Sequence, residues 1–158
     1  MQITSTSILN ENRVPLEEAQ ARIEKWLDNV TPLFREDPNA TPRALFIPME
    51  DVKALLAEHP HADGIRVYYG IKPPVTKLPP SLDPPLSLEV CGLLVPVVQD
   101  DAGNHTDVLS GTINEDGTVS KEKEDDDNIY DFTTPCPVYC DRSSKLFLPL
   151  PDQAVNGQ

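Results

Sequence analysis

Proline is the residue that most constrains how this chain folds. The 158-residue sequence holds 17 prolines but only 7 glycines. Proline fixes its own φ, lacks a backbone N–H and disfavours helix at the residue before it. The segment 73–85, PPVTKLPPSLDPP, is nearly half proline and is expected to form an extended connector. The sequence therefore predicts many fixed turns and connectors between its regular elements.

Two helices are predicted, over residues 15–30 and 48–58. Each opens at a proline followed by acidic residues, which suit the first turn and the helix dipole. Apolar residues recur in both with a period near 3.6, which predicts one buried stripe per helix. The lone tryptophan, Trp26, is expected to anchor the core. The stripes consist of Leu16, Ala19, Ile23, Trp26, Leu27 and Val30 and of Met49, Val52, Leu55 and Leu56.

Five strands are predicted from runs rich in apolar and β-branched residues. The run GIRVYYGIK alternates, so its odd-numbered side chains are expected to face the core. Turn signals at 100–104 and 114–117 predict a meander of two hairpins. Pro96 cannot donate a ladder hydrogen bond, which predicts an edge strand or a bulge there. The strand ranges are 43–47, 64–72, 86–99, 105–113 and 117–120.

The predicted fold class is α+β, with an antiparallel sheet of about five strands and two helices packed on one face. A chain of this length is expected to form a single domain, 1–158. Residues 1–13 and 151–158 are expected to be loose ends, and 121–128 an acidic surface loop.

The net charge of −13, from 13 basic and 26 acidic residues, limits the classes of partner that the chain is expected to bind. Nucleic acids and anionic membranes attract basic proteins, so neither is expected as a partner. Solubility is the main role expected of this charge, and another protein is the kind of partner it still permits. No apolar run approaches the length of a membrane span, and the first residues lack a signal-peptide pattern. A cytoplasmic location is expected.

The most distinctive stretch is YDFTTPCPVYCD, residues 130–141, in which Cys136 lies between two prolines. If a short helix begins at Pro137, Cys136 caps it and Cys140 lies about one turn on, so both sulfurs share a face. The helix dipole then favours the thiolate of Cys136. This pattern predicts a reactive thiol or a metal-binding pair.

A zinc site needs about four ligands, which Cys136 and Cys140 do not supply alone. Cys91, His105 and Asp141 are the further candidates, and the predicted metal set is Cys136, Cys140 and His105. The commoner interpretation is that the prolines shape a tight turn and the sulfurs pack inside as small apolar groups. A disulfide is a third alternative, disfavoured in a reducing compartment.

Other candidate clusters have ordinary explanations. The acidic run at 122–127 lacks the spacing and glycine of an EF-hand, so a solvated loop is expected. His59 and His61 are expected to form a polar helix terminus rather than a metal site.

Arg66 and Tyr68 project from one strand face, and with Arg43 they suggest an anion site. Pairing with acids of a covering helix, such as Glu17, Glu18 or Glu24, is the commoner outcome for arginines placed in this way. No nucleophile elbow, zinc-protease motif, P-loop or dinucleotide-binding glycine pattern occurs.

Three segments resemble small uncharacterised bacterial proteins of the Bacteroidetes type. They are RALFIPMEDV from Arg43, GIRVYYG from Gly64 and YDFTTPCPVYC from Tyr130, and the similarity spans roughly residues 15–141. That group implies no function, so no site residue follows from the resemblance.

The function expected from the sequence is an acidic binding or interaction domain without catalysis. The alternative is a metal-binding or thiol-active protein that uses Cys136 and Cys140.

Overall fold

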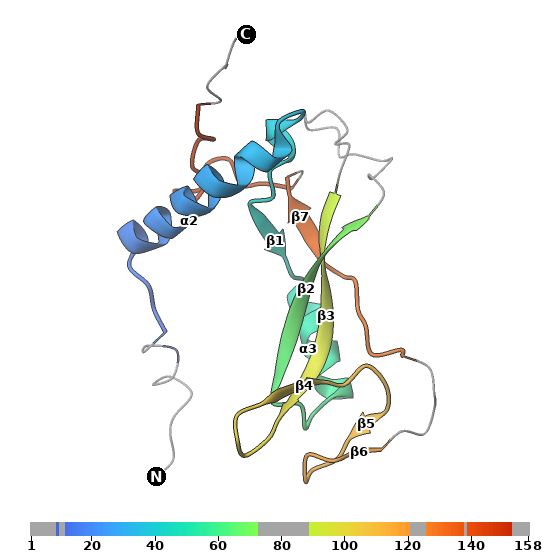
Figure 1. Ribbon diagram of the computed structural model, residues 1–158. Coiled ribbons are helices and arrows are strands. Elements are labelled where there is room, and N and C mark those ends of the chain that lie inside the picture. The colour runs from blue at the N-terminus through green and yellow to red at the C-terminus, as the bar shows by residue number, and fades with distance from the viewer. Residues whose placement is uncertain (1–8, 10–11, 73–88, 121–125, 138, 153–158) are drawn as a thin grey trace.

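The computed structural model of the chain describes residues 9, 12–72, 89–120, 126–137 and 139–152 (Figure 1). The predicted connector 73–85 lies outside the described residues, as do most of the two predicted loose ends and residues 121–125 of the acidic loop. The described part is an α+β structure with two helices and three small antiparallel sheets.

Both predicted helices are present, as α2 (Leu16–Val30) and α3 (Met49–Glu58). Each begins directly after a proline and carries two acids in its first turn, as the sequence predicts. The predicted stripes are only partly buried, because Leu27 and Leu55 are the only residues of the two helices that lose nearly all solvent contact. Two short 3-10 helices, Thr31–Phe34 and Pro38–Ala40, follow α2 and lead into the first strand.

The main sheet has the strand order β2-β3-β4, with β2 at Gly64–Lys72, β3 at Glu89–Gln99 and β4 at His105–Asp107. β2 and β3 pair without a slip from Gly64↔Val97 to Lys72↔Glu89. β3 supplies much of the buried core. Its buried apolar residues are Cys91, Leu94, Val95, Pro96 and Val97.

The prediction of one five-stranded sheet is wrong, because the remaining strands form two separate pairs. β1 (Ala44–Phe46) pairs with β7 (Thr134–Cys136), and β5 (Thr112–Ile113) pairs with β6 (Val119–Ser120). The helices do not share one sheet face either. Figure 1 shows α2 beside β1 and β7, whereas α3 lies near β2 and β3.

The strand predicted at 105–113 breaks in the middle, and this break separates β4 from β5. Asn128 accounts for the break, since its side-chain amide donates to the carbonyls of Val108 (3.2 Å) and Gly111 (2.9 Å). Gly111 also has a positive φ of 87°, which strand geometry does not accept. Both predicted hairpins nevertheless form, one between β3 and β4 and one between β5 and β6.

Pro96 lies in the central strand, so the expectation of an edge or bulge there is wrong. Pro96 is opposite Ile65 of β2 within an uninterrupted register. β4 pairs only with Val97–Gln99, so that ladder ends one residue before the proline. The Pro96 carbonyl accepts a hydrogen bond from the Val108 N–H (2.9 Å), so this residue's backbone faces the β4 side of the strand. The Pro96 nitrogen therefore faces the side where the β4 ladder has ended, and its missing N–H removes no bond from the β2 ladder.

The β1–β7 pair packs against the main sheet at Gly92. The Gly92 N–H donates to Thr133 Oγ1 (2.8 Å). A Cβ added at Gly92 would lie 2.9 Å from Leu45 Cδ1 and 2.9 Å from Val67 Cγ1. Glycine is therefore required here by the close approach of β1 and β2 side chains.

The odd-numbered side chains of β2 do not form the predicted core face. Among the described residues, Ile65, Val67, Tyr69 and Ile71 all remain exposed. The opposite face behaves differently, because Arg66 and Tyr68 reach across β3 to Asp107 of β4, with Arg66 Nη1 2.5 Å from Asp107 Oδ1. This polar bridge lies over β3 and helps to cover Val95, the register partner of Arg66.

Candidate functional site

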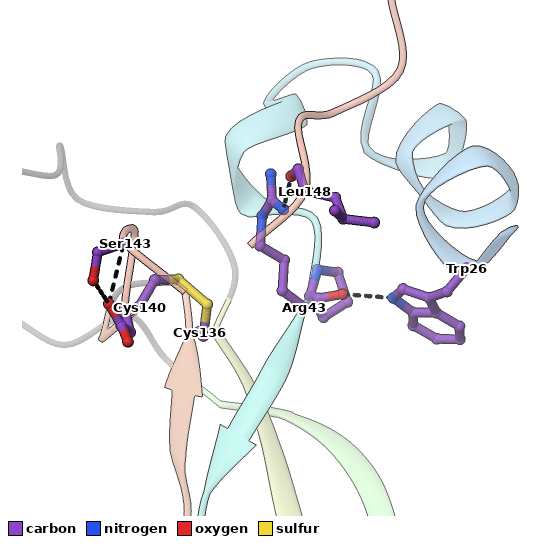
Figure 2. Close-up of a disulfide and its surroundings, with 8 residues drawn as sticks. Trp26, Arg43, Cys136, Cys140, Ser143 and Leu148 are labelled. Atoms are coloured by element: carbon purple, nitrogen blue, oxygen red, sulfur yellow. Dashed lines mark hydrogen bonds between the residues drawn. A yellow bond between two sulfur atoms is a disulfide. The ribbon is translucent and has the colours of Figure 1, made fainter. Parts of the chain in front are cut away.

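The two cysteines of the distinctive stretch form a disulfide, with their Cα atoms 4.8 Å apart (Figure 2). The predicted helix does not begin at Pro137. Cys136 instead ends β7, pairs with Ala44 of β1, and precedes a cis peptide bond to Pro137. Of the three alternatives at these cysteines, the structure contains the disulfide. The predictions that Cys136 caps a helix and that a helix dipole favours its thiolate are therefore wrong.

The structure does not bring the third predicted ligand to the cysteines. His105 is exposed in β4, opposite Gln99, in a different sheet from Cys136. Within the described ranges, no group of three or more His, Cys, Asp or Glu side chains could hold a metal ion. A disulfide sulfur is not a thiolate ligand, so a zinc site at Cys136 and Cys140 stays a prediction for the reduced chain.

The other ligand candidates have structural roles. Cys91 is buried in β3. His59 is the C-terminal cap residue of α3, and its Nε2 lies 2.8 Å from the Tyr130 hydroxyl. The Asp141 carboxylate accepts from the Ser143 N–H (3.0 Å) and hydroxyl (2.6 Å), and these hydrogen bonds lower the pKa of Asp141.

The predicted anion group is divided between two places. Arg66 and Tyr68 bind Asp107, not the helix acids Glu17, Glu18 and Glu24 that the sequence suggested as partners for the arginine. Arg43 lies at the other end of the molecule, beside the disulfide and α2 (Figure 2). Arg66 is therefore already committed to a carboxylate, whereas the surroundings of Arg43 are different.

A cleft of about 310 Å³ opens between α2, β1 and β7 and reaches the ends of β2 and β3. Its volume is at the lower end of the range typical of small-molecule sites. Most of its lining surface is apolar. The lining residues are Arg22, Ile23, Trp26, Ala40, Pro42, Arg43, Ala44, Leu45, Tyr69, Val90, Pro135, Cys136 and Pro137.

The aromatic side chains of this cleft are accessible. Trp26 is 43% exposed and Tyr69 is 76% exposed, so the expectation that Trp26 anchors the core is wrong. The Trp26 indole N–H donates to the Pro42 carbonyl (2.7 Å), which fixes the ring against the chain that enters β1 (Figure 2). An indole held at one edge and open on its surface can contact an apolar ligand.

The walls of the cleft are joined by contacts between distant segments. The Arg43 N–H donates to the Cys136 carbonyl (2.8 Å), which extends the β1–β7 ladder by one bond. Gln20 of α2 donates to the Lys145 carbonyl (2.9 Å), so the C-terminal segment is also held to the helix. The first contact joins β1 and β7, which both line the cleft, and the second holds α2 to a segment outside the described lining.

Two basic residues lie in the described lining of the cleft. They are Arg22 and Arg43, and no acidic residue is among the described lining residues. Arg22 Nε lies 2.7 Å from Glu18 Oε1 on the exposed surface of α2. Arg22 is therefore paired with a carboxylate next to the cleft, and the cleft is mainly an apolar hollow.

Arg43 is the more constrained of the two arginines. Its Nη1 donates to the Leu148 carbonyl (2.5 Å), and its Cζ lies 4.3 Å from the centre of the Phe147 ring. Burial lowers the pKa of Arg43, and the positive charge of Arg142 lowers it further. Among the described residues, Arg43 has no carboxylate partner.

A second hollow of about 330 Å³ lies on the disulfide side of β1. It shares Ile23, Arg43, Ala44, Leu45 and Cys136 with the first cleft, and its further lining residues include Cys140, Asp141 and Phe147. The wall between the two hollows is thus formed by β1 and the end of β7. The disulfide fixes the chain direction immediately after that wall.

Sequence reasoning selected Cys136 and Arg43 but missed the cleft in which they lie. The missed lining residues come from α2, β1, β2, β3 and β7, and no local pattern connects these segments. The weak signal was the pair of prolines around Cys136, which indicated a shaped turn. No sequence pattern indicated that Trp26 is exposed, because a residue in the apolar stripe of a helix is normally buried.

No described helix is both long and apolar enough to cross a membrane. Comparison with known protein families, with characterised proteins and with solved structures finds no match to this chain, so the family resemblance of its three segments stays a prediction.

Proposed function

We propose that the chain is a binding domain without catalysis, and that the cleft between α2, β1 and β7 receives an apolar group of the ligand. The observation that carries this proposal is the apolar hollow of about 310 Å³ with Trp26 and Tyr69 exposed at its surface. Concave apolar sites with a few polar groups are the usual places where proteins bind ligands. The ligand is a small molecule or a side chain of a partner protein.

The test uses phenylpropionamide, a neutral probe with an aromatic body. Its binding is followed by the fluorescence of Trp26, which is the sole tryptophan of the chain, and by NMR chemical shifts. We expect a Kd of about 1 mM, because a ligand of this size gains only a few kcal/mol. Shift changes should be confined to the cleft residues.

A filled cleft supplies the decisive variant. Ala44 lines the cleft from the surface of β1, so Ala44→Phe should occupy the hollow and weaken probe binding at least about tenfold. Ala54→Phe makes the same change on an exposed position of α3 and should leave binding unchanged. Equal effects of the two variants on probe binding would show that the probe does not bind in the cleft.

A second candidate function is thiol–disulfide chemistry at Cys136 and Cys140, and the disulfide itself is the observation that favours it. In the reducing cytoplasm predicted from the sequence, disulfides are usually transient and either catalytic or redox-sensing. The reaction would take two electrons and two protons from a dithiol donor and leave two thiols. Elemental analysis after reduction distinguishes a further metal-binding role, since about one zinc per chain, lost in Cys136→Ser, would support it.

A further inference from the structure

We propose that the free edge of β2 is an interface between two copies of this chain, whose β2 strands pair antiparallel around a two-fold axis at Tyr68. The inference goes beyond the proposed function and does not depend on the cleft. β2 lies at one margin of the β2-β3-β4 sheet, so one of its sides has no neighbouring strand among the described residues (Figure 1). With nine residues, Gly64–Lys72, it is longer than most strands.

The hydrogen bonds of β3 show which backbone groups of β2 are free. Leu94 exchanges its two backbone hydrogen bonds with Tyr130, on the side of β3 away from β2. Its register partner Val67 is therefore not bonded to β3, and the Val67 N–H and C=O point to the free side. The antiparallel ladder repeats every two residues, so all four odd-numbered residues from 65 to 71 present both groups there. Among the described residues, no hydrogen bond outside the β2–β3 ladder involves these groups.

A second copy of β2 matches this pattern of free groups. When Tyr68 lies opposite the same residue of the second copy, Ile65 lies opposite Ile71 and Val67 lies opposite Tyr69. Every residue with free groups then faces another such residue, and each facing pair exchanges two hydrogen bonds. A shift of the register by two residues would leave Ile65 or Ile71 without such a partner. The backbone therefore favours one symmetric register.

The side chains that this register brings together are apolar. Ile65 would contact Ile71 and Val67 would contact Tyr69 on one face of the joined sheet, and such cross-strand pairs stabilise antiparallel sheets. Their exposed fractions rise from 37% for Ile65 and Val67 to 76% for Tyr69. With Tyr68 these side chains expose on the order of 500 Å² per copy, which is small for an interface and predicts a weak dimer.

The charges of β2 permit two acidic chains to approach each other at this edge. The strand contains no acidic residue, and its two basic residues are paired within their own chain. Arg66 is paired with Asp107 (2.5 Å), and Lys72 lies 3.8 Å from Asp131. Each basic residue would lie opposite a glycine of the second copy, so no like charges face each other. A strongly charged peptide would find no complementary charge here, whereas a second copy brings an equally neutral strand.

A second copy also closes the assembly. The far side of β3 is occupied by β4 and, at Leu94, by Tyr130. β4 is only three residues long. The joined sheet, in the order β4-β3-β2-β2-β3-β4, would therefore have no long free edge among the described strands, and two-fold pairing would stop at a dimer.

Analytical ultracentrifugation from about 10 μM to about 1 mM tests the association, for which we expect a Kd of about 100 μM. Hydrogen exchange identifies the interface. The amides of Ile65, Val67, Tyr69 and Ile71 should exchange about fivefold more slowly at the highest concentration, because most chains are then paired. The even-numbered amides of β2 bond to β3 and should be protected equally at every concentration.

Two charge variants test the register. Ile71→Lys and Ile65→Glu each place a charge opposite an isoleucine and should weaken dimerisation at least about tenfold. Both positions are exposed, so the fold should be retained, which circular dichroism checks. An equimolar mixture places the two new charges opposite each other and should restore association to within about threefold of the parent chain. Ile129→Lys changes an exposed isoleucine outside β2 and should leave association unchanged.

Each outcome supports or overturns the inference. A chain that stays monomeric at the highest concentration would overturn it, leave the cleft proposal untouched and leave the β2 edge to a strand of another protein. A dimer in which the odd-numbered amides of β2 gain no protection would also overturn it, because the contact would lie elsewhere. Failure of the mixture to restore association would exclude the symmetric register. An equal loss of association in Ile129→Lys would show that the copies associate without a defined edge.

Discussion

The two ends of the molecule are built in opposite ways. The β2–β3–β4 sheet joins strands that follow one another in the sequence, and its central strand is buried. The cleft end joins β1 to β7, which are far apart in the sequence, and leaves a hollow with exposed aromatic rings. The sheet end also has a hollow, of about 360 Å³ beside Gly64, Arg66 and His105, but the described lining of that hollow is more polar than the lining of the cleft.

The arginines at the two ends also have different partners. Arg66 of the sheet is neutralised by Asp107 on a strand of the same sheet. Arg43 of the cleft end stacks on Phe147 and bonds to a carbonyl. A committed ion pair stabilises a surface, whereas an arginine without a described carboxylate partner remains available to a ligand. The proposed function is placed at the cleft end because of the apolar hollow there, where Trp26 and Tyr69 are exposed.

The largest effect is expected at Gly92, where the two ends touch. Gly92→Ala should lower the free energy of unfolding by about 3 kcal/mol, because the new Cβ lies 2.9 Å from both Leu45 Cδ1 and Val67 Cγ1. Urea denaturation measures the change. Gly64→Ala is the matched control at the start of β2, because a Cβ there has no atom within 4 Å. Equal stabilities of the two variants would show that the ends do not press against each other at Gly92.

The elements that the sequence predicts well are those set by neighbouring residues. The prolines before α2 and α3, the alternation in GIRVYYGIK and the glycines of the two hairpin turns all act within a few residues. The alternation also placed Arg66 and Tyr68 on one face, but it could not identify Asp107 as their partner. The alternation therefore predicted the strand and which side chains share a face, but it assigned the odd-numbered face to the core, and that face is exposed.

The elements that the sequence misses depend on contacts between distant residues. β7 is only three residues long, contains a proline and is a strand only because Ala44–Phe46 lies beside it. The cleft required α2, β1 and β7 to be placed together, so neither its volume nor the exposure of Trp26 was predictable. The described residues contain no helix cap at Cys136, because pairing with β1 takes that residue into a strand.

Removal of the disulfide tests whether the cleft end needs a covalent constraint, which the main sheet does not have. Replacing both Cys136 and Cys140 by alanine should lower the free energy of unfolding by about 2 kcal/mol, the loop entropy expected for a bridge over four positions. Denaturation of the parent chain with and without a reductant should show the same difference. The double variant should not respond to the reductant. A loss below about 0.5 kcal/mol would mean that β1–β7 pairing holds this end without the bridge.

The smallest effect concerns Tyr130, which flanks β3 and pairs with Leu94 in an isolated bridge. Burial, followed by the negative charge of Glu58, raises the pKa of Tyr130 to about 12 from a usual value of 10.0. Between these pH values the unfolded chain loses this proton more readily than the folded chain. The folded state binds more protons in this window, so its stability should fall as the pH rises from 10 towards 12.

Tyr130→Phe removes the titrating group and should flatten this part of the stability profile, measured by urea denaturation at successive pH values. Tyr139→Phe is the control, because it removes an exposed phenol near the disulfide and leaves Tyr130 in place. The Tyr139→Phe profile should keep the slope of the parent chain. Parallel profiles for all three proteins would show that the Tyr130 ring is no better shielded than an exposed one. The margin of β3 beside α3 would then be as open to water as the cleft end, and the contrast between a buried central strand and exposed cleft residues would not extend to this margin.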